Sequence, residues 1–406
     1  MQRMKVAVIG GGVSGLGAAY VLSRSGHDVR LFEREPRLGG HVNTVVHEGL
    51  ALDTGFIVSN ARNYPLLTRL FAELGVAFQR SEMSFSVSCD ACGLEYAGRR
   101  PFAQWRNAGS ARFTSLMWEI GRWLRTARSS IESGAYDDLS LGDYLTERSY
   151  SGRFRRHFIV PLTSALWSAA PTRTLEIPAA YAIRFFDNHG MLGIRRHRWR
   201  TVQGGAQTYV QAVRGYLRSA DTNLPVRGIR READAVLVRT DDDVVRPFDR
   251  VVVATHADEA LALLEDPTDS ERRLLGAFGY TRNDAVLHTD ASLLPRSRGA
   301  HASWNYRVDG AERPTVTYYL NRLQRLEAER DYLVTLNQPV ADEHVIRRIS
   351  YRHPRFTVEA IRAQKRLGEI SGQRNTEFAG AYFGNGFHED GLAAGVRAAA
   401  ALGARW

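Results

Sequence analysis

A glycine-rich turn near the start of the chain carries the first sign of chemistry. Three glycines in the pattern GxGxxG follow the apolar run KVAVIG and precede GAAYVLSRSG, a segment of helical composition. Glycines at this spacing let backbone N–H groups approach a pyrophosphate closely, and the positive end of the following helix favours its negative charge. We therefore expect a dinucleotide to bind through Gly10, Gly12, Val13, Ser14 and Gly15.

A carboxylate follows where a ribose contact is expected. The second apolar run, DVRLFE, ends in Glu33, and an acid about 20 residues beyond the glycines can bind a ribose 2′-hydroxyl. Such an acid favours the unphosphorylated ribose of FAD or NAD over that of NADP. A glycine-rich turn that binds nothing is the structural alternative.

The residues after Glu33 indicate FAD rather than NAD as the cofactor. They read REPRLGGH and, after a further apolar strand, LDTGF. This run resembles the flavin-containing amine oxidase superfamily, which includes amine oxidases, phytoene desaturases and protoporphyrinogen oxidases. The resemblance implies an FAD cofactor, a glycine pair close to it and the TGF segment near the isoalloxazine. Members commonly have Arg or Lys where this chain has His41. The implied contacts are Arg34, Gly39, Gly40, His41, Gly55 and Phe56.

Two later segments extend the resemblance. A predicted hairpin, Val236 to Thr240 and Val244 to Phe248, leads into the buried strand RVVVAT, which includes Ala254. Near the C-terminus the run FAGAYFGNGFHEDGLAAG predicts a strand, a glycine-rich turn and a helix. Backbone N–H groups at that helix N-terminus would face flavin O2 and N1, where negative charge accumulates on reduction. The residues assigned there are Gly386, Asp390, Gly391 and Leu392; Asp390 can equally cap the helix.

The middle of the chain resembles one bacterial subgroup more closely. The matching runs are FFDNHG, WRTVQGG, SWNY, YYLNRLQ and GFHEDG. Members of this subgroup are FAD-dependent proteins often encoded beside cyclopropane-fatty-acid-synthase-type methyltransferases. The resemblance implies a lipid or other small-molecule substrate, such as an unsaturated or methyl-branched acyl chain, and a methyltransferase as a pathway partner.

These motifs require an α/β, two-lobed fold in which separated segments meet. We expect a Rossmann-type FAD-binding domain formed by residues 1–80, 200–270 and 366–406. Residues 81–199 and 271–365 would form a substrate domain of mixed sheet plus helices, as in amine oxidases. Apolar residues at three- and four-residue steps from Phe113 to Ile131 predict a helical insertion over about 103–199.

The predicted reaction is hydride transfer between a substrate carbon and flavin N5, which would desaturate or saturate a C–C bond. It needs an acid or base near the ring. The candidates are His388, Glu389, His301 and Asn321, and a structural role is an alternative for each.

Other reactions on the same scaffold are amine oxidation and isomerisation without net redox change. Related amine oxidases often place a lysine near flavin N5. This chain has only Lys5 and Lys365, and neither falls in the expected part of the substrate sheet. Lysine scarcity therefore counts against amine oxidation. A flavin-binding structural partner of a methyltransferase is a further alternative.

Cys89 and Cys92 form the only CxxC pattern, for which a redox pair or half a metal site is an alternative. Structural zinc needs four ligands, and the sequence offers no others nearby, so we expect no metal and interpret the pair as the turn of a β-hairpin. Two cysteines in the whole chain favour a reducing compartment. The apolar N-terminus breaks into glycines too early for a signal peptide, which favours the cytoplasm.

The formal net charge of +10 comes almost wholly from arginine, because all but two of the 54 basic residues are Arg. This bias weakens the charge as a sign of a polyanionic partner. The cluster Arg195 to Arg200 lacks any nucleic-acid-binding motif, so no nucleic acid is expected. The cluster and the basic helix leave peripheral membrane contact open, although solvated arginines and an ordinary core helix are the simpler interpretations.

Overall fold

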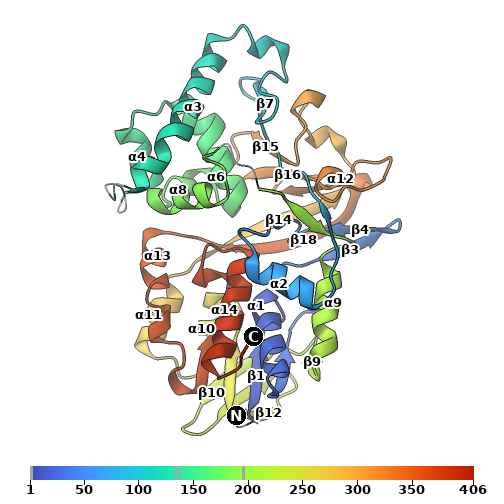
Figure 1. The fold of residues 1–406 in the computed structure, drawn as a ribbon, viewed down its shortest axis with the longest axis vertical. Coiled ribbons are helices and arrows are strands. Elements are labelled where there is room, and N and C mark those ends of the chain that lie inside the picture. The colour runs from blue at the N-terminus through green and yellow to red at the C-terminus, as the bar shows by residue number, and fades with distance from the viewer. Residues whose placement is uncertain (1–2, 133, 135, 137–138, 194–196) are drawn as a thin grey trace.

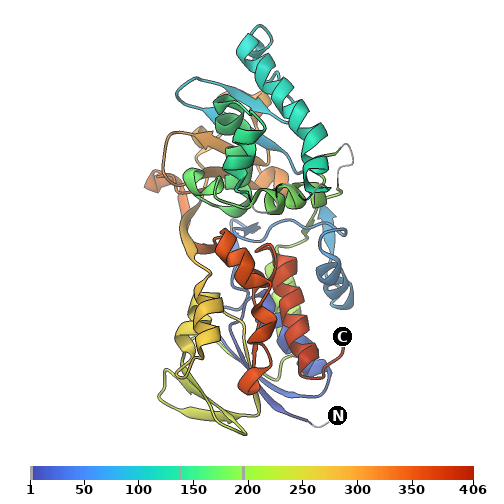
Figure 2. The same ribbon diagram turned by 90° about the vertical axis from the view of Figure 1, so that its left-hand side faces the viewer.

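The computed structural model describes residues 3–132, 134, 136, 139–193 and 197–406, and these form two lobes (Figure 1). Both termini lie in the same lobe (Figure 2). No helix within these residues is long and apolar enough to cross a membrane. Arg195 and Arg196 of the predicted basic cluster lie outside the described residues.

A five-stranded parallel sheet organises the lobe that holds the termini. Its order is β19-β13-β1-β2-β9. The central strands β1 and β13 are nearly continuous apolar runs, as expected for a parallel sheet buried on both faces. They come from three distant parts of the chain: β1 (Lys5–Ile9), β2 (Asp28–Phe32), β9 (Ser219–Asp221), β13 (Arg250–Val253) and β19 (Thr376–Phe378).

Two helices pack tightly on this sheet, α1 (Val13–Arg24) and α14 (His388–Ala401). Their backbones approach closely because glycines face each other's helix. A Cβ at Gly17 would lie 2.5 Å from Leu392 Cδ1, and one at Gly395 would collide with the Ser14 carbonyl. The N-terminus of α14 is thereby fixed beside the glycine-rich turn that opens α1.

An antiparallel meander and further helices flank this lobe. The meander contains β10 (Val226–Arg231), β11 (Val236–Thr240) and β12 (Val245–Phe248), which confirms the predicted hairpin. The helices and short strands around the sheets are α2 (Pro65–Glu73), α9 (Gln207–Tyr216), α10 (Ala257–Leu263), α11 (Asp269–Gly276), α13 (Val358–Gln364), β3 (Thr44–His47), β4 (Leu50–Asp53), β5 (Phe78–Arg80) and β8 (Arg200–Val202).

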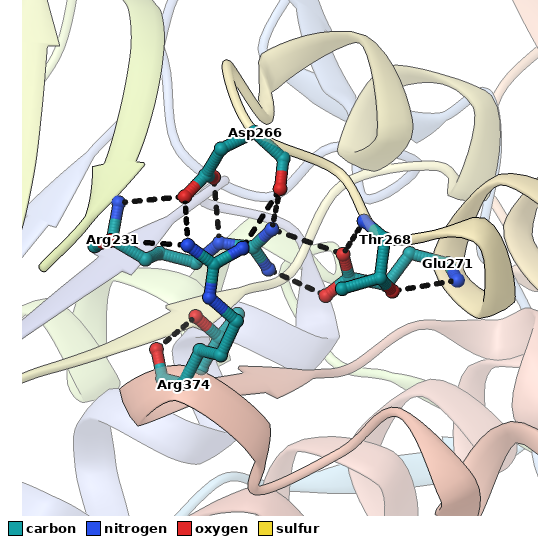
Figure 3. A network of polar contacts seen from close by, with 6 residues as sticks. Arg231, Asp266, Thr268, Glu271 and Arg374 are labelled. Atoms are coloured by element: carbon teal, nitrogen blue, oxygen red, sulfur yellow. Dashed lines mark hydrogen bonds and ion pairs between the residues drawn. The ribbon is translucent and has the colours of Figure 1, made fainter. Parts of the chain in front are cut away.

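A buried ion-pair network, here called the Arg231 network, ties the meander to α11 (Figure 3). The Arg231 guanidinium, fully buried, binds Glu271 at 2.5 and 3.0 Å and Asp266 at 2.9 Å. Glu271 also accepts the backbone N–H of Thr268, and Arg374 pairs with Asp266. Burial alone would raise the pKa of Glu271, but these donors hold it below its ordinary value.

The second lobe has a seven-stranded sheet in the order β18-β14-β17-β16-β15-β6-β7. The apolar runs VTYYL and DYLVTL contain most of β16 and β17. The strands are β6 (Phe85–Cys89), β7 (Glu95–Ala97), β14 (Tyr280–His288), β15 (Trp304–Val308), β16 (Thr315–Tyr319), β17 (Leu333–Leu336) and β18 (Val345–Pro354), with the short α12 (Leu320–Leu323) between β16 and β17.

A helical layer covers this sheet, in the region predicted to be helical (Figure 1). In α3 the predicted apolar face is buried at Phe113, Leu116 and Ala127, but Leu124 is 38% exposed and Trp123 is fully buried instead. Trp123 fills the centre of an aromatic cluster, which explains the difference. The layer comprises α3 (Ala111–Glu132), α4 (Leu141–Glu147), α5 (Gly152–Phe154), a π-helical turn (Arg155–Ile159), α6 (Val160–Trp167), α7 (Pro171–Thr174) and α8 (Ala179–Asn188).

Candidate cofactor and active site

The predicted dinucleotide turn has the geometry of an anion site. Gly10 lies at φ +103°, and a Cβ there would sit 2.6 Å from the carbonyl oxygen of Ala254. A Cβ at Gly12 would meet no atom within 4 Å, so this face of the turn is open. Val13 and Ser14 begin α1 directly after Gly12, which has no side chain to cap the helix. The first-turn N–H groups are thus available to a diphosphate.

Glu33 closes the other side of the turn. One carboxylate oxygen accepts the Gly11 N–H at 2.7 Å, and the other accepts the Glu35 N–H at 2.9 Å. Arg34 points elsewhere: its guanidinium lies 3.1 Å from Glu259 on α10, and its side chain is 57% exposed. Of these two predicted contacts, Glu33 lies at the turn and Arg34 binds a surface carboxylate.

The glycine pair lies against this turn. Gly39 donates to the Gly11 carbonyl at 2.8 Å, and Gly40, at φ +57°, faces Gly12. Arg37 donates to the carbonyls of Gly40 and Val42. The Arg37 cation therefore lies beside the glycine pair. It comes four residues before His41, the position where members of the resembled superfamily commonly have Arg or Lys.

His41 opens a cluster that sequence reasoning missed, here called the histidine cluster: His41, His256, His353 and Tyr351. The His41 ring stacks on Tyr351 at 5.0 Å between centroids and lies 5.3 and 6.1 Å from the rings of His353 and His256. His41 Nε2 is buried and makes no hydrogen bond to the described part of the chain. A buried polar atom without a partner is uncommon and needs an explanation.

The surroundings of this cluster favour the neutral form of its histidines. Burial lowers the pKa of His41 well below its ordinary value, and the neighbouring His353 and His256 lower it further. Burial also lowers the pKa of His256 and brings that of His353 to about 4. Neutral imidazole offers one donor and one acceptor, so His41 Nε2 can donate to a phosphate or accept from a ring N–H.

Gly55 and Phe56 lie next to this cluster. A Cβ at Gly55 would collide with the His41 carbonyl, which itself accepts the Phe56 N–H at 3.0 Å. Thr54 Oγ1 lies 2.8 Å from the Tyr351 hydroxyl. The structure therefore joins the TGF segment to His41, the residue after the glycine pair.

Asp53, one residue earlier, was not predicted. It is fully buried and accepts the Ala206 N–H at 2.9 Å, and it also binds Thr44 and Gln324. Burial raises its pKa to about 7. Asp53 thus links the TGF segment to the part of the chain that re-enters the first lobe after β8. The only sequence signal for Asp53 was its place in LDTGF.

The N-terminus of α14 holds two of the catalytic candidates in supporting positions. His388 stacks on Phe56 at 4.0 Å and its Nε2 lies 2.6 Å from the Tyr209 hydroxyl; burial lowers its pKa to about 3. Glu389 accepts the N–H groups of Leu66 and Leu67 at 2.7 and 3.0 Å. Glu389 thus caps α2, and His388 buttresses Phe56.

The remaining predicted residues lie in α14 or in the turn just before it. Asp390 accepts the Phe387 N–H at 2.9 Å, so it caps the helix as one of its two predicted roles. Burial raises its pKa. Gly391 packs against Val13, and Leu392 is fully buried against α1. Gly386, at φ +88°, packs against Phe356.

His301 and Asn321 lie in other parts of the second lobe. His301 Nε2 lies 2.8 Å from the Pro295 carbonyl. The Asn321 amide binds the Arg330 carbonyl and the Tyr332 N–H, both at 2.7 Å, and so closes the turn between α12 and β17. The four catalytic candidates are therefore not brought together.

A cavity of about 490 Å³ lies where the two lobes meet, bounded by α8, α13 and the glycine-rich turn before α14. Its lining includes the aromatic rings of Tyr181 and Phe185, two cations, Arg184 and Lys365, and Asn385. Its lining contains no carboxylate. The Asn385 carbonyl also accepts the indole N–H of Trp167 at 3.2 Å, so α6 reaches the same turn.

Comparison with known proteins agrees with this geometry. A family model described as flavin containing amine oxidoreductase matches residues 13–403. The chain is 28% identical over 277 residues to a putative flavin-containing monoamine oxidase of Mycobacterium tuberculosis, covering 64% of this chain and 59% of that protein. It is 38% identical over 71 residues to a 4,4'-diaponeurosporene oxygenase of Staphylococcus haemolyticus, 16% and 14% of the two chains. The chain thus spans less than two thirds of the length of these curated relatives.

Solved structures share the fold over nearly the whole chain. A putrescine oxidase bound to putrescine superposes with a TM-score of 0.73, 15% identity and 100% of both chains covered. A CLA-producing fatty acid isomerase from P. acnes gives 0.70, 19% identity and 97% coverage of both. The predicted mixed α/β, amine-oxidase-like fold is confirmed.

Proposed function

The chain belongs to the flavin-containing amine oxidoreductase family, and from this premise we propose that it is an FAD-dependent oxidoreductase acting on a fatty-acyl or related anionic lipid. The reaction would move a hydride between a substrate carbon and the flavin, introducing or removing a C–C double bond. Family membership supports a flavin oxidoreductase; the choice of FAD and of lipid is our proposal.

The residues of the first lobe fit FAD. The open face of Gly12 and the first turn of α1 would hold the diphosphate, and Glu33 would face the adenosine ribose. The unpartnered Nε2 of His41, next to Gly40, would contact the cofactor in place of the arginine or lysine of relatives. We propose that residues 1–80, 200–270 and 366–406 form this FAD-binding domain and that 81–199 and 271–365 form the substrate domain.

When bound, FAD supplies the redox chemistry, by accepting or donating a hydride at N5. The chain's own residues bind and orient the cofactor and the substrate, and they exclude water. The N-terminus of α14 directs its dipole at the cofactor site, where it favours negative charge. His388 and Tyr209 hold Phe56 in place. Asn385 lines the cavity, and its carbonyl accepts the indole N–H of Trp167.

The lining of the cavity carries the substrate proposal. Its aromatic rings suit an acyl chain, and Lys365 suits a carboxylate or phosphate headgroup. Among the described lining residues a protonated amine would meet the Lys365 cation and no carboxylate, which disfavours its binding.

Anaerobic mixing tests this proposal. We expect unsaturated or methyl-branched fatty acids or phospholipids to bleach the flavin absorbance if the enzyme is a desaturase. If it is a reductase, NAD(P)H or another donor should bleach it and these lipids should restore it. K365Q should raise the lipid concentration needed several-fold, whereas R362Q, a matched change on the same helix outside the cavity lining, should not. Bleaching by amines alone would overturn the lipid proposal.

Amine oxidation is the second candidate, favoured by the 28% identity to the mycobacterial protein over 64% of the chain. Of the two lysines, Lys5 begins β1 and Lys365 lines the cavity next to Asn385. If Lys365 served an amine oxidase, K365Q would slow flavin reduction by amines. Isomerisation without net redox change would leave the flavin unbleached while the lipid product changes.

We further propose, first, that the protein acts in a lipid pathway linked to a methyltransferase. Second, we propose that it is cytoplasmic and contacts membranes peripherally to reach its substrate. The resemblance of the runs FFDNHG and GFHEDG to the methyltransferase-associated subgroup supports the first. The second proposal is supported by the two unpaired cysteines and by two exposed tryptophans, Trp105 and Trp118, at arginine-rich α3. Co-purification with vesicles containing anionic lipid, lost for W118S, would test it.

A further inference from the structure

The two cysteines lie in a place that the proposed function does not explain. Cys89 ends β6 and is buried, and Cys92 is exposed in the turn that leads to β7. The turn is tight: the Gly93 N–H donates to the Cys89 carbonyl, and the Cys89 N–H donates to the Leu94 carbonyl, both at 2.8 Å. Gly93 lies at φ +66°, a conformation that favours glycine. Both thiols are therefore held on one side of a rigid hairpin.

A histidine from another layer completes the group. His157 lies in the π-helical turn Arg155–Ile159, and its Nε2 lies 3.6 Å from Cys92 Sγ. The ligand atoms of Cys89, Cys92 and His157 all lie within 4.8 Å of one another. Single π-helical turns are rare and often place a functional side chain. The sequence could not show this contact, because 65 residues separate Cys92 from His157.

We propose that Cys89, Cys92 and His157 form a zinc site with a fourth position open to solvent. Zn–S bonds of about 2.3 Å and Zn–N bonds of about 2.0 Å in a tetrahedron separate sulfur from nitrogen by about 3.5 Å. The observed 3.6 Å matches this separation. Two thiolates and one imidazole select zinc over calcium or magnesium, which prefer oxygen ligands.

The surroundings suit this ligand set. Asp90, between the cysteines, is engaged by Arg307 at 3.0 Å and so is not available as a ligand. Arg106 donates to the Gly93 carbonyl and so holds the turn that carries Cys92.

The site would join two layers of the second lobe. The hairpin is the edge of the seven-stranded sheet, whereas the π-helical turn belongs to the helical layer and runs into α6. The Tyr96 hydroxyl donates to the His157 carbonyl at 2.6 Å along the same seam. Because the π-helical turn continues into α6, which ends at Trp167 beside the Asn385 carbonyl, zinc would anchor α6 to the edge of the sheet.

Metal analysis of the purified holoenzyme tests the site. After removal of metal with a chelator, titration with Zn²⁺ should restore one ion per chain and raise the melting temperature. Co²⁺ in its place should give a thiolate-to-cobalt charge-transfer band and the intense d–d bands of tetrahedral coordination. C92S, H157Q and C89S should each lose these signals, and H344Q, a change of a histidine elsewhere, should keep them.

Cys92 is exposed, so C92S should fold, and its flavin absorbance and circular dichroism would verify this. Several results would overturn the proposal: no stoichiometric metal in the refilled wild type, an unchanged cobalt spectrum in H157Q, or a Cys89–Cys92 disulfide that persists in reductant and blocks loading. None of these readouts depends on flavin chemistry, so the zinc site and the proposed function can fail separately.

Discussion

The Arg231 network and the histidine cluster are both polar and largely buried, but they differ in how their hydrogen bonds are satisfied. Every charged group of the Arg231 network has partners within the chain, from Glu271, Asp266 and Arg374 (Figure 3). The histidine cluster leaves the Nε2 of His41 without one. A complete network stabilises a fold, whereas an incomplete one beside an anion-binding turn is suited to a ligand. The comparison predicts that changes in the first affect stability and changes in the second affect cofactor binding.

The largest expected effect is on stability, from R231M. Removing one partner of a buried ion pair leaves Glu271 uncompensated and should lower the free energy of unfolding by about 3–5 kcal/mol. Urea denaturation followed by circular dichroism measures it, with R374Q as the control. Arg374 is 39% exposed, so its loss should cost below about 1 kcal/mol. Equal losses in both variants would contradict the account.

The second-largest effect is expected on cofactor affinity, which should fall in H41L. Loss of a hydrogen bond to a charged group is worth about 1.5–3 kcal/mol, which corresponds to roughly 10- to 100-fold in the dissociation constant. Because Leu removes a buried polar atom that has no partner, the stability of the apoprotein should stay the same or rise. H41R should recover binding. Fluorescence titration of apoprotein with FAD measures it. A destabilised H41L that binds FAD normally would reverse the comparison.

The pH dependence of apoprotein stability separates the two regions further. Burial holds the pKa of His353 at about 4 and that of His388 at about 3, below the ordinary value of about 6.5. The unfolded chain therefore protonates these histidines first as the pH falls, so their contribution to stability is full above about pH 6.5 and declines toward pH 4. Melting temperatures between pH 8 and 4 test this. H353Q should flatten the decline, and an unchanged slope would contradict the cause.

The smallest effect is expected at the surface, from R34Q. Arg34 pairs with Glu259 on an exposed face, so its loss should cost below about 1 kcal/mol. FAD affinity should change less than about threefold if the guanidinium stays with Glu259. A tenfold weaker affinity would restore Arg34 to the cofactor site, where the sequence had placed it.

Local patterns predicted the first lobe well. The apolar run before Gly10, the hairpin ending at Phe248 and the strand before Gly386 depend on neighbouring residues, and all are present. The place of each residue in the candidate site was harder to predict from the sequence. Glu389 caps α2 across 323 residues, and the ring of His353 reaches His41 only because β18 extends to the lobe boundary. Contacts of this kind depend on the tertiary arrangement, and no local spacing encodes them.

The helical layer shows the same division. The periodicity from Phe113 predicted a helix, and α3 is one, but the aromatic cluster around Trp123 determined which face is buried. Likewise the CxxC pattern predicted the hairpin, and the π-helical turn alone brought His157 to it.

The cofactor content of the purified protein tests the central claim most directly. We predict a yellow protein that, on denaturation, releases FAD in a ratio of one per chain, identified by chromatography and mass. A colourless protein that cannot be reconstituted with FAD, or one that releases a different flavin, would contradict it.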